Sequence, residues 1–432
     1  MEALRGYARE CVHVRARYDA VKLVVVTPHF TPDIAPTGIV LTRIVEELTQ
    51  RGHRVEVITA LPWYREHRIE PGFEGRLTRT EDTPWGRIVR VHPFPAADKR
   101  DIFRRAIAFA GFSVMASAAG VSGGSVDGLL AVSPPLTLGL TGLVLARARK
   151  APVVFNIQDV YPDVAIELGA LENKMLMGAA RRLESFCYNH ADATTVLSED
   201  LRDNVRAKTN HPERVHVIPN FVDTTFVRPM EKENPYRREY GLVGRRVVMY
   251  AGNVGLSQSL DIVLECASAL AYEEDLVFVI NGQGAARAEL ERHARGLPNV
   301  RFVDMQPPER LPELLAAGDI HLVPLKKGLA RSSMPSKTYS ILAAARPLVA
   351  SVDAGSEVTR VIERSGAGVA VPPEDAEALT KAVRSLLDAP EQMRRMCEAG
   401  RAWVESWASP AAVAESYERL FDRLRRQRGR PH

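Results

Sequence analysis

The stretches "KLVVVT" (residues 22–27) and "TGIVLTRIVEELTQRGHRVEVITA" (37–60) carry the pattern from which we predict the fold. The first is apolar almost throughout. The second begins with apolar residues at helical spacing, reaches Gly52, and ends in a run that again reads as a strand. Strands that are apolar on both faces and alternate with helices are typical of a parallel sheet covered by helices. We therefore predict an α/β fold built on a Rossmann-like, doubly wound sheet.

The same alternation continues along the chain, breaks once, and then restarts. The break is a segment rich in proline, charge and turn residues, with similar strand–helix units on both sides. Two such units would face a cleft and bind a ligand at the carboxyl ends of their strands, and the last helix would cross back to brace the first domain. We predict an N-terminal extension at 1–20, an N-terminal Rossmann-like domain at 21–220, a linker at 221–244, a C-terminal Rossmann-like domain at 245–405, and a crossover helix with a basic tail at 406–432.

The composition narrows the class of protein further. At 432 residues the chain is long for a single hydrophobic core, and 46% hydrophobic with 25% charged residues leaves little room for disorder. Its 57 basic residues are nearly matched by 53 acidic ones, so we expect no nucleic-acid partner. The four cysteines are far apart and form no CxxC pair, which favours the reducing cytosol over a disulfide framework or a structural zinc site.

One apolar segment raises the question of a membrane. "AIAFAGFSVMASAAGV" (106–121) is too short to span a bilayer and contains serines and glycines. It follows a basic flank, so residues 99–121 have two open interpretations: a buried helix of the first domain, or a helix on the surface of the cytoplasmic membrane. The basic flank consists of Lys99, Arg100, Arg104 and Arg105.

A polar, cationic loop, "KKGLARSSMPSKTYS" (326–340), follows a predicted strand of the second domain and enters a small-residue helix. The chain has no GxxxxGK[ST] motif and no Asp-x-Asp pair to hold a metal on a diphosphate. Cationic side chains and the free N–H groups of a helix start could bind a diphosphate without a metal, whereas the alternative is an ordinary capped helix with solvated lysines. The loop carries Lys326, Lys327, Arg331 and Lys337 around Ser332, Ser333 and Ser336.

Several stretches together resemble a known family. "IPNFVD" (218–223), "MYAGNVGLSQSLDIVLE" (249–265), "SVDAGSEVTRVIERSGAGVAVPPEDAEAL" (351–379) and the two-unit layout are similar to the family-4 retaining glycosyltransferases of the GT-B fold. The likeness is closest to the bacterial envelope-polysaccharide branch that includes the L-fucosamine transferases, and it covers about residues 21–425. It implies donor binding in the C-terminal domain, acceptor binding in the N-terminal domain, and no metal requirement.

The family's donor residues are only partly present here. Where the family usually has two glutamates, this chain has Ser332 and Ser340. A serine cannot clamp the ribose diol with two acceptors as a carboxylate does. Glu357 is a substitute or, equally, an ordinary acid at a helix N-terminus.

The family's Arg and Lys pair after the first strand of the second domain is also missing. Asn253 stands in the place of the Arg, and Gln258 lies near the place of the Lys. We infer that the cationic role has moved to Arg331 and Lys337, while Asn253 and Gln258 hydrogen-bond the phosphates.

In the N-terminal domain, the family's glycine-rich turn matches Thr37 and Gly38, for which a plain strand-to-helix loop is the rival interpretation. Asp159 follows a predicted strand where many members carry a histidine, and a carboxylate there could stabilise the anomeric carbon or orient the acceptor hydroxyl. Asp163 reads as a helix cap, and His29 reads as a catalytic or a merely solvated histidine.

These observations predict a cytosolic or membrane-surface glycosyltransferase. It would move a sugar from a nucleotide-diphosphate donor to an acceptor hydroxyl with retention, in cell-envelope polysaccharide or glycolipid synthesis. As the donor, we favour a UDP-N-acetyl sugar over GDP-mannose. The acceptor would be either lipid-linked, at the inner face of the cytoplasmic membrane, or soluble. The alternatives are a GT-B nucleotide-sugar epimerase and an inactive sugar-nucleotide-binding scaffold. We assign catalytic roles to Asp159, Lys337 and Arg331, and donor binding to Thr37, Gly38, Asn253, Gln258, Ser332, Ser333, Ser336, Ser340 and Glu357, with no metal ligand.

Overall fold

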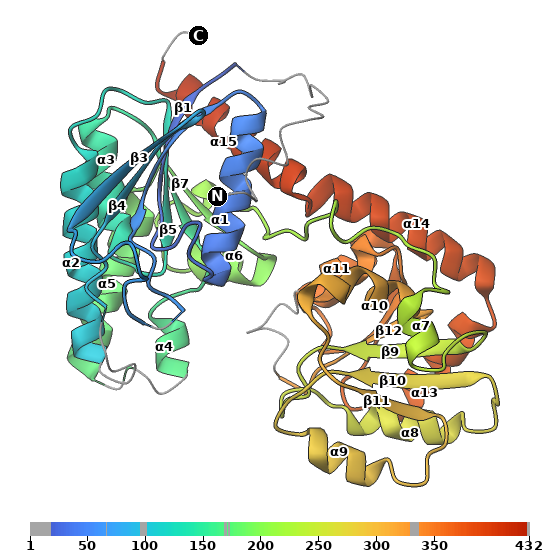
Figure 1. Cartoon of the computed structure of the whole chain (residues 1–432). Coiled ribbons are helices and arrows are strands. Elements are labelled where there is room, and N and C mark those ends of the chain that lie inside the picture. The colour runs from blue at the N-terminus through green and yellow to red at the C-terminus, as the bar shows by residue number, and fades with distance from the viewer. Residues whose placement is uncertain are drawn as a thin grey trace. The chain divides into compact units, whose positions relative to one another are not determined.

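The chain forms two units, each around its own sheet (Figure 1). The computed structural model describes residues 19–65, 67–95, 102–167, 171, 173–328 and 337–429, with the backbone alone for 102–106 and 167. Unit 1 consists of Met1–Ile218 and Ala414–His432, and unit 2 of Pro219–Val413. The two-domain α/β architecture predicted from the strand–helix alternation is confirmed.

Unit 1 is built on an eight-stranded sheet, sheet A, with the strand order β3-β4-β2-β1-β5-β6-β7-β8. All its strand pairs are parallel except β3 with β4. The order reverses between β1 and β5, which makes the carboxyl end of these strands the place where such sheets bind ligands. Its elements are β1 (Lys22–Val26), α1 (Pro36–Gln50), β2 (Arg54–Ala60), β3 (Thr78–Thr83), β4 (Gly86–Val91), α2 (Ile102–Gly120), β5 (Gly128–Ser133), α3 (Leu138–Ala148), β6 (Val153–Ile157), α4 (Asp163–Glu167), α5 (Lys174–His190), β7 (Ala193–Val196), α6 (Glu199–Arg206), a 3-10 turn (Pro212–Arg214), β8 (Val215–Val217) and α15 (Pro410–Gln427).

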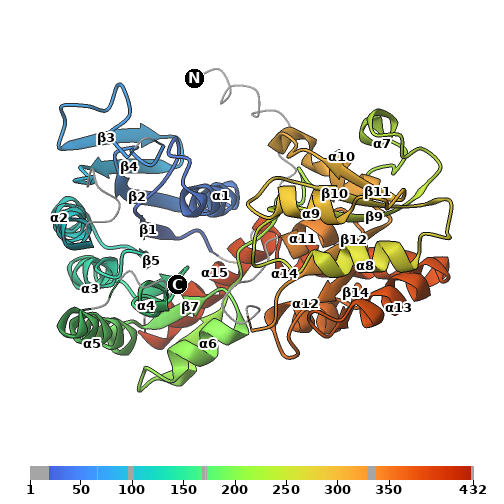
Figure 2. The same ribbon diagram turned by 90° about the horizontal axis from the view of Figure 1, so that it is seen from below.

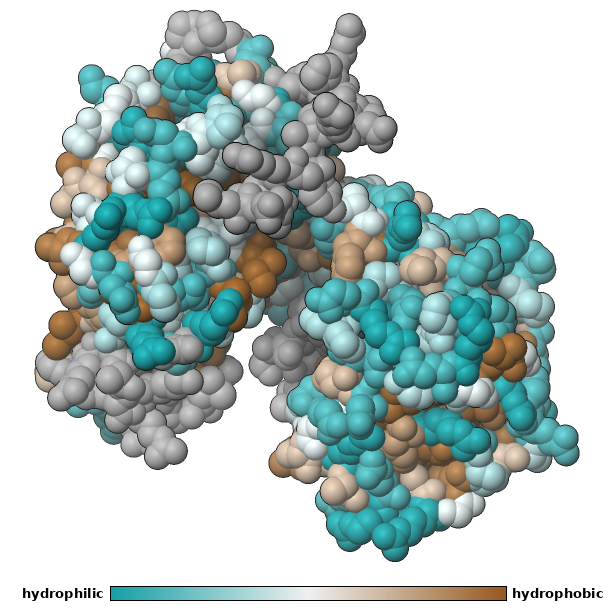
Figure 3. Space-filling view, in the orientation of Figure 1, coloured by the Kyte–Doolittle hydropathy of each residue, from teal (hydrophilic) through white to brown (hydrophobic). Residues whose placement is uncertain are grey.

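Helices α2, α3 and α5 lie in one layer on one face of sheet A, and α1 and α15 lie on the other (Figure 2). Helix α2 packs on the sheet through the buried Phe112 and Ala116, as the buried-helix interpretation of 106–121 predicts. Its outward side is apolar as well, and brown side chains line the edge of unit 1 where Figure 1 draws α2 (Figure 3). The buried-helix interpretation is therefore confirmed for the inward side of α2, and the membrane-surface interpretation stays a prediction.

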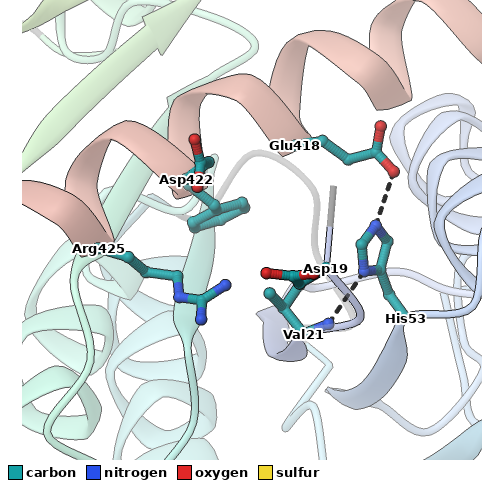
Figure 4. A pocket seen from close by; sticks show the side chains of 7 residues that line it. Asp19, Val21, His53, Glu418, Asp422 and Arg425 are labelled. Atoms are coloured by element: carbon teal, nitrogen blue, oxygen red, sulfur yellow. Dashed lines mark hydrogen bonds and ion pairs between the residues drawn. The ribbon is translucent and has the colours of Figure 1, made fainter. Parts of the chain in front are cut away.

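Helix α15 returns the end of the chain to unit 1, as predicted for the crossover helix. Glu418 accepts a hydrogen bond at 2.7 Å from Nε2 of His53, and both side chains are buried (Figure 4). The Val21 N–H donates to Nδ1 of the same ring at 3.2 Å, so the proton of this imidazole sits on Nε2. Phe421 packs so closely on Gly128 that an added Cβ there would lie 2.4 Å from the ring.

Unit 2 is built on a six-stranded parallel sheet, sheet B, with the order β11-β10-β9-β12-β13-β14. Its order reverses between β9 and β12, so the carboxyl end of β9 is the corresponding switch point. Its elements are α7 (Pro235–Glu239), β9 (Arg246–Ala251), α8 (Asp261–Ala269), β10 (Leu276–Asn281), α9 (Arg287–His293), β11 (Val300–Val303), a 3-10 turn (Pro308–Arg310), α10 (Leu311–Ala317), β12 (Ile320–Pro324), α11 (Lys337–Ala343), β13 (Leu348–Ser351), α12 (Glu357–Ser365), β14 (Gly368–Val371), α13 (Ala376–Leu387) and α14 (Pro390–Trp407).

The segment 221–244, which we read as a linker, packs against unit 2. Val222, Val227, Tyr236 and Leu242 are all buried in a core cluster of that unit. These four apolar residues are hard to recognise as core residues in the sequence. Prolines and charged residues surround them, and their spacing follows neither a helical nor a strand period.

Candidate functional site

Four loops meet at the carboxyl edge of sheet B, where hydrogen bonds link each loop to the next. The loops after β9 and β10 are joined by Val254 N–H, which donates to the Gln283 carbonyl at 2.9 Å. The loop after β12 joins the β9 loop through Lys326 N–H, which donates to the Ser257 carbonyl at 3.0 Å. It also joins the loop after β13, because Gly328 N–H donates to the Asp353 carboxylate at 2.8 Å. The edge around the β9/β12 switch point is thus one connected surface.

Glycines allow the first two of these loops to approach so closely. Gly282 has a φ of +154°, and an added Cβ would lie 1.8 Å from the carbonyl oxygen of Gly252. At Gly284 an added Cβ would lie 2.2 Å from the Val254 carbonyl oxygen. "NGQG" (281–284) is therefore a strand-to-helix turn whose glycines serve loop packing within unit 2.

Lys337, the first residue of α11, places its ammonium at this switch point. Its Nζ lies 4.2 Å from the centroid of the Tyr250 ring, at the end of β9. An added Cβ at Gly252 would lie only 3.2 Å from Nζ, so the ammonium covers the backbone of that glycine. Among the residues that the structure describes, no carboxylate pairs with Lys337, and burial of the ammonium lowers its pKa to about 8. An unpaired cation in this position is suited to bind an anion.

The other donor-binding candidates of unit 2 that can be described lie around the same edge. Asn253 is exposed in the β9 loop, and its carbonyl oxygen accepts from the Tyr250 hydroxyl at 2.5 Å. Gln258 accepts from the Gly255 N–H at 3.0 Å, which holds the loop in shape. Ser340 lies on α11, one turn after Lys337.

Glu357 is the first residue of α12, directly after the capping Ser356. Its carboxylate forms an ion pair with Arg360, with the Nη2 atom at 3.0 Å. This contact matches the interpretation of Glu357 as an acid at a helix N-terminus. Arg331, Ser332, Ser333 and Ser336 lie outside the described residues.

In unit 1, Thr37 and Gly38 lie in the first turn of α1. An added Cβ at Gly38 would lie 2.9 Å from the Cβ of His29 and 3.2 Å from its carbonyl carbon. The close approach that this glycine permits is therefore to the loop after β1, at the switch point of sheet A.

His29 is more than a solvated loop histidine. Its Nδ1 lies 2.7 Å from the buried carboxylate of Asp33, and its ring stacks on Trp63 with centroids 5.5 Å apart. Tyr64 approaches the same ring edge-on at 5.4 Å. Sequence reasoning missed Asp33, Trp63 and Tyr64, although an aromatic pair directly after a predicted strand is a signal that could have drawn attention to them.

Asp159 and Asp163 follow β6 in different environments. Asp159 is an exposed residue two positions beyond the end of β6. The surrounding chain still partly desolvates its carboxyl group, which disfavours the charged form and raises its pKa. Asp163 does not cap α4 through its side chain. It binds the Lys208 ammonium at 2.6 Å, and this contact outweighs burial and lowers its pKa. Asp159 therefore remains available for chemistry, whereas Asp163 is occupied by a structural ion pair.

In the part of the chain that the structure describes, the His, Cys, Asp and Glu side chains do not gather into groups of three or more that could hold a metal ion. No helix within the same ranges has the length and apolar content needed to cross a membrane.

Two Rossmann-like units with a returning C-terminal helix define the GT-B fold of glycosyltransferases, and comparisons with known proteins agree. Residues 37–220 match the family described as glycosyl transferase 4-like domain, and residues 245–389 match glycosyl transferases group 1. The chain is 30% identical to WcaI of Escherichia coli (strain K12), whose name assigns it to colanic acid biosynthesis as a glycosyl transferase. That match covers 86% of this chain and 93% of WcaI. The chain therefore belongs to the family-4 glycosyltransferases.

Solved structures share the same fold at low sequence identity. Sucrose-phosphate synthase from Thermosynechococcus elongatus superposes with a TM-score of 0.65 at 17% identity, covering 93% of this chain and 98% of that one. HepE from Anabaena, solved in complex with UDP, superposes with a TM-score of 0.63 at 12% identity, covering 93% of this chain and 100% of HepE. These likenesses support the GT-B architecture predicted from the sequence.

Proposed function

We propose that this glycosyltransferase moves a sugar from a nucleotide-diphosphate donor to an acceptor hydroxyl in polysaccharide or glycolipid synthesis. The name of WcaI and the UDP bound to HepE support this proposal. The finer assignments are also ours: a UDP-linked N-acetylated sugar as donor, as the likeness to the L-fucosamine branch implies, retention at the anomeric carbon, a lipid-linked acceptor, and action at the cytoplasmic side of the membrane.

One observation carries the proposed donor site: the Lys337 ammonium lies at the switch point of sheet B with no carboxylate partner in the part of the chain that the structure describes. It lies over Tyr250 beside the bare backbone of Gly252, where no carboxylate among the described residues neutralises it. Strand β9 ends here, and the family carries its own cations in the loop that follows it. In this chain Asn253 and Gln258 occupy that loop, so Lys337 supplies from α11 the charge that the loop lacks.

The proposed chemistry is that of the retaining family that the sequence resembles. The bond between the anomeric carbon and the diphosphate oxygen breaks, and the acceptor oxygen bonds to the same carbon from the same face. The departing phosphate oxygen takes the proton of the acceptor hydroxyl. The Lys337 ammonium stabilises the negative charge that grows on the leaving diphosphate, and Arg331 is proposed to share this role. Asp159, in unit 1, is proposed to orient the acceptor hydroxyl or to stabilise the positive charge on the anomeric carbon.

Calorimetric titration with UDP, GDP and ADP, each with and without EDTA, tests the donor site. We expect one nucleotide to bind equally well with and without EDTA. Lys337→Ala should weaken that binding by about 10- to 100-fold, which corresponds to the free energy of a hydrogen bond to a charged group. The matched control is Lys381→Ala, an exposed lysine on α13. If no nucleotide binds, or if the two alanine variants behave alike, the assignment of Lys337 is wrong.

Transfer assays with the same variants test catalysis. Because the charge on the diphosphate grows during bond cleavage, Lys337→Ala should lower turnover by a larger factor than it lowers nucleotide affinity. Equal losses in both would restrict Lys337 to ground-state binding.

A further inference from the structure

The outward stripe of α2 is wholly apolar. Residues 107, 110, 114, 118 and 121, at helical spacing, are all exposed, and they are isoleucine, alanine, valine, alanine and valine. Val114, in the middle of the helix, is 67% exposed. A surface helix of a globular protein normally turns polar and charged residues to the solvent, so this stripe is suited to contact something other than water.

The two neighbouring helices continue this surface. Helix α3 adds the exposed Leu140 and Val144, and α5 adds Met175, Leu176 and Phe186. Helix α3 contacts both α2 and α5, and the three helices run side by side in one layer (Figure 2). We call the exposed surface of α2, α3 and α5, with the residues that directly follow α2 and α3, the three-helix face.

The charges on the three-helix face have one sign. The sequences of the three helices contain a single acidic residue, Glu184, which is buried. The exposed cations are Arg147, Lys150, Lys174, Arg181 and Arg182. The whole chain is nearly balanced, with a net charge of +4, so this segregation of apolar and basic residues is local.

We propose that the three-helix face docks the protein on an anionic lipid bilayer. Apolar side chains enter the boundary between headgroups and acyl chains, while lysine and arginine heads meet the anionic headgroups. A second copy of this chain fits less well, because a two-fold interface would set this basic face against itself. The inference deepens the proposed function and rests on it for its purpose, which is to bring the enzyme to a lipid-linked acceptor.

Co-sedimentation of the full chain with vesicles tests the proposal. We compare phosphatidylcholine vesicles with vesicles that contain about one-third phosphatidylglycerol, an anionic lipid. Binding should require the anionic lipid and weaken as salt is raised. Arg181→Glu with Arg182→Glu should lower the partition coefficient about tenfold or more, since each basic residue near such a surface contributes severalfold.

The apolar contribution is tested with Val114→Glu, for which Val243→Glu is the matched control. Val243 is 57% exposed and belongs to unit 2, so it is not part of the three-helix face. We expect Val114→Glu to lose vesicle binding and Val243→Glu to keep it. No binding by the wild type, equal binding to both vesicles, or equal behaviour of the two variants would each overturn the proposal. So would self-association that Val114→Glu abolishes, because this would assign the face to a second copy.

Titration with UDP on the same variants separates this proposal from the donor site. Variants that lose vesicle binding but keep UDP affinity would support docking independently of the sugar chemistry. If the wild type bound vesicles but no nucleotide, the proposed donor site would be wrong, whereas the proposal that the three-helix face docks on a bilayer would be supported.

Discussion

Lys337 combines an ammonium that is largely withdrawn from water with the lack of a carboxylate partner among the described residues. Burial lowers its pKa to about 8 because water can no longer solvate the ammonium fully. Lys337 therefore loses its proton more readily near physiological pH, and a bound anion would stabilise the protonated form. Ligand binding and protonation are then coupled.

This coupling predicts the pH dependence of UDP binding. The terminal phosphate of UDP is fully ionised above about pH 7, so the lysine dominates the change at higher pH. Below pH 8 the free site already holds the proton and affinity should be flat. Above pH 8 binding must take up a proton, and affinity should fall by up to about tenfold per pH unit. Calorimetric titrations from pH 7 to 9.5 would measure this slope.

Lys337→Arg is the control for that slope. An arginine stays protonated over the whole range, so the variant should bind UDP with an affinity that does not change between pH 7 and 9.5. A slope that persists in the arginine variant would have to come from another group, and the role of the Lys337 proton would be refuted.

The same lowered pKa predicts a cost in stability. The pKa of a lysine in the unfolded chain is near 10.5, so below pH 8 the folded protein holds a charge that its surroundings disfavour. This destabilisation is complete below pH 8, fades between pH 8 and 10.5, and is absent above. Lys337→Met should therefore raise the free energy of unfolding by about 2 kcal/mol at pH 7, a value discounted for partial exposure and for the contact with Tyr250. Urea denaturation of both proteins at pH 7 and pH 10 would show whether the gain shrinks as pH rises.

Sequence reasoning could select Lys337 but not its surroundings. A lysine in a polar loop before a small-residue helix is visible in one stretch of sequence. Tyr250 lies in an apolar run that reads only as a core strand, and it meets Lys337 because β9 and α11 come together across the sheet. The His29–Asp33 pair is close in sequence, yet the stacking on Trp63 depends on how β1 and β2 pair.

At the scale of secondary-structure elements, the loops after β9 and β10 act as one piece. Gly284→Ala would bring a Cβ to 2.2 Å from the Val254 carbonyl and 2.8 Å from the Asn253 side chain. A backbone carbonyl cannot move out of the way as the tip of a side chain can, so the clash should displace the β9 loop. We expect UDP affinity to fall about tenfold, with a smaller loss of overall stability. Titration and thermal denaturation of the same sample would measure both.

Gly124→Ala is the matched control for this change. Nothing lies within 4 Å of the position of its added Cβ, and its φ is outside the range that favours glycine. It should leave UDP affinity unchanged. If Gly284→Ala also left it unchanged, the close contact between the two loops would not shape the donor site.

Helices and strands could be predicted from the sequence where their hydrophobic residues follow a single clear pattern. The buried strands of both sheets stand out because nearly every residue is apolar, as in "VVFNI" of β6 and "LVFVIN" of β10. The β3–β4 hairpin was missed, because "TRTEDT" of β3 is polar and alternates between exposed and half-buried positions. An edge strand of this kind is defined by the neighbour with which it pairs, and its own composition carries little signal.

At the scale of the whole molecule, the chain leaves unit 1 after Ile218 and returns to it at Ala414. The fold of unit 1 therefore depends on residues nearly 200 positions later in the sequence, on α15. Apolar periodicity predicts that this helix packs on something, but its specific partners are not visible in the sequence. Phe421 on Gly128 and Glu418 with His53 only become neighbours in the folded unit.

Glu418 should carry much of the docking energy of α15. Its two carboxylate oxygens accept from His53 at 2.7 Å and from Arg51 at 3.0 Å, and the glutamate side chain is only 1% exposed. Glu418→Ala would leave the His53 N–H without its acceptor in a buried place and would remove one ion-pair partner of Arg51, which typically costs about 3 kcal/mol or more. Scanning calorimetry should show the unfolding transition of unit 1 at a lower temperature, while the transition that UDP shifts upward, assigned to unit 2, stays where it is.

Glu398→Ala is the control, because Glu398 pairs with Arg394 on the exposed face of α14 and such surface pairs contribute about 0.5 kcal/mol or less. If Glu418→Ala cost no more than this control, the buried carboxylate would add nothing, and α15 would be held by its apolar packing and its other polar contacts, such as the hydrogen bond from Asn156 to the Tyr417 hydroxyl. If Glu418→Ala instead lowered both transitions equally, the two units would unfold as one cooperative body, because loss of a contact inside unit 1 would have been transmitted to unit 2.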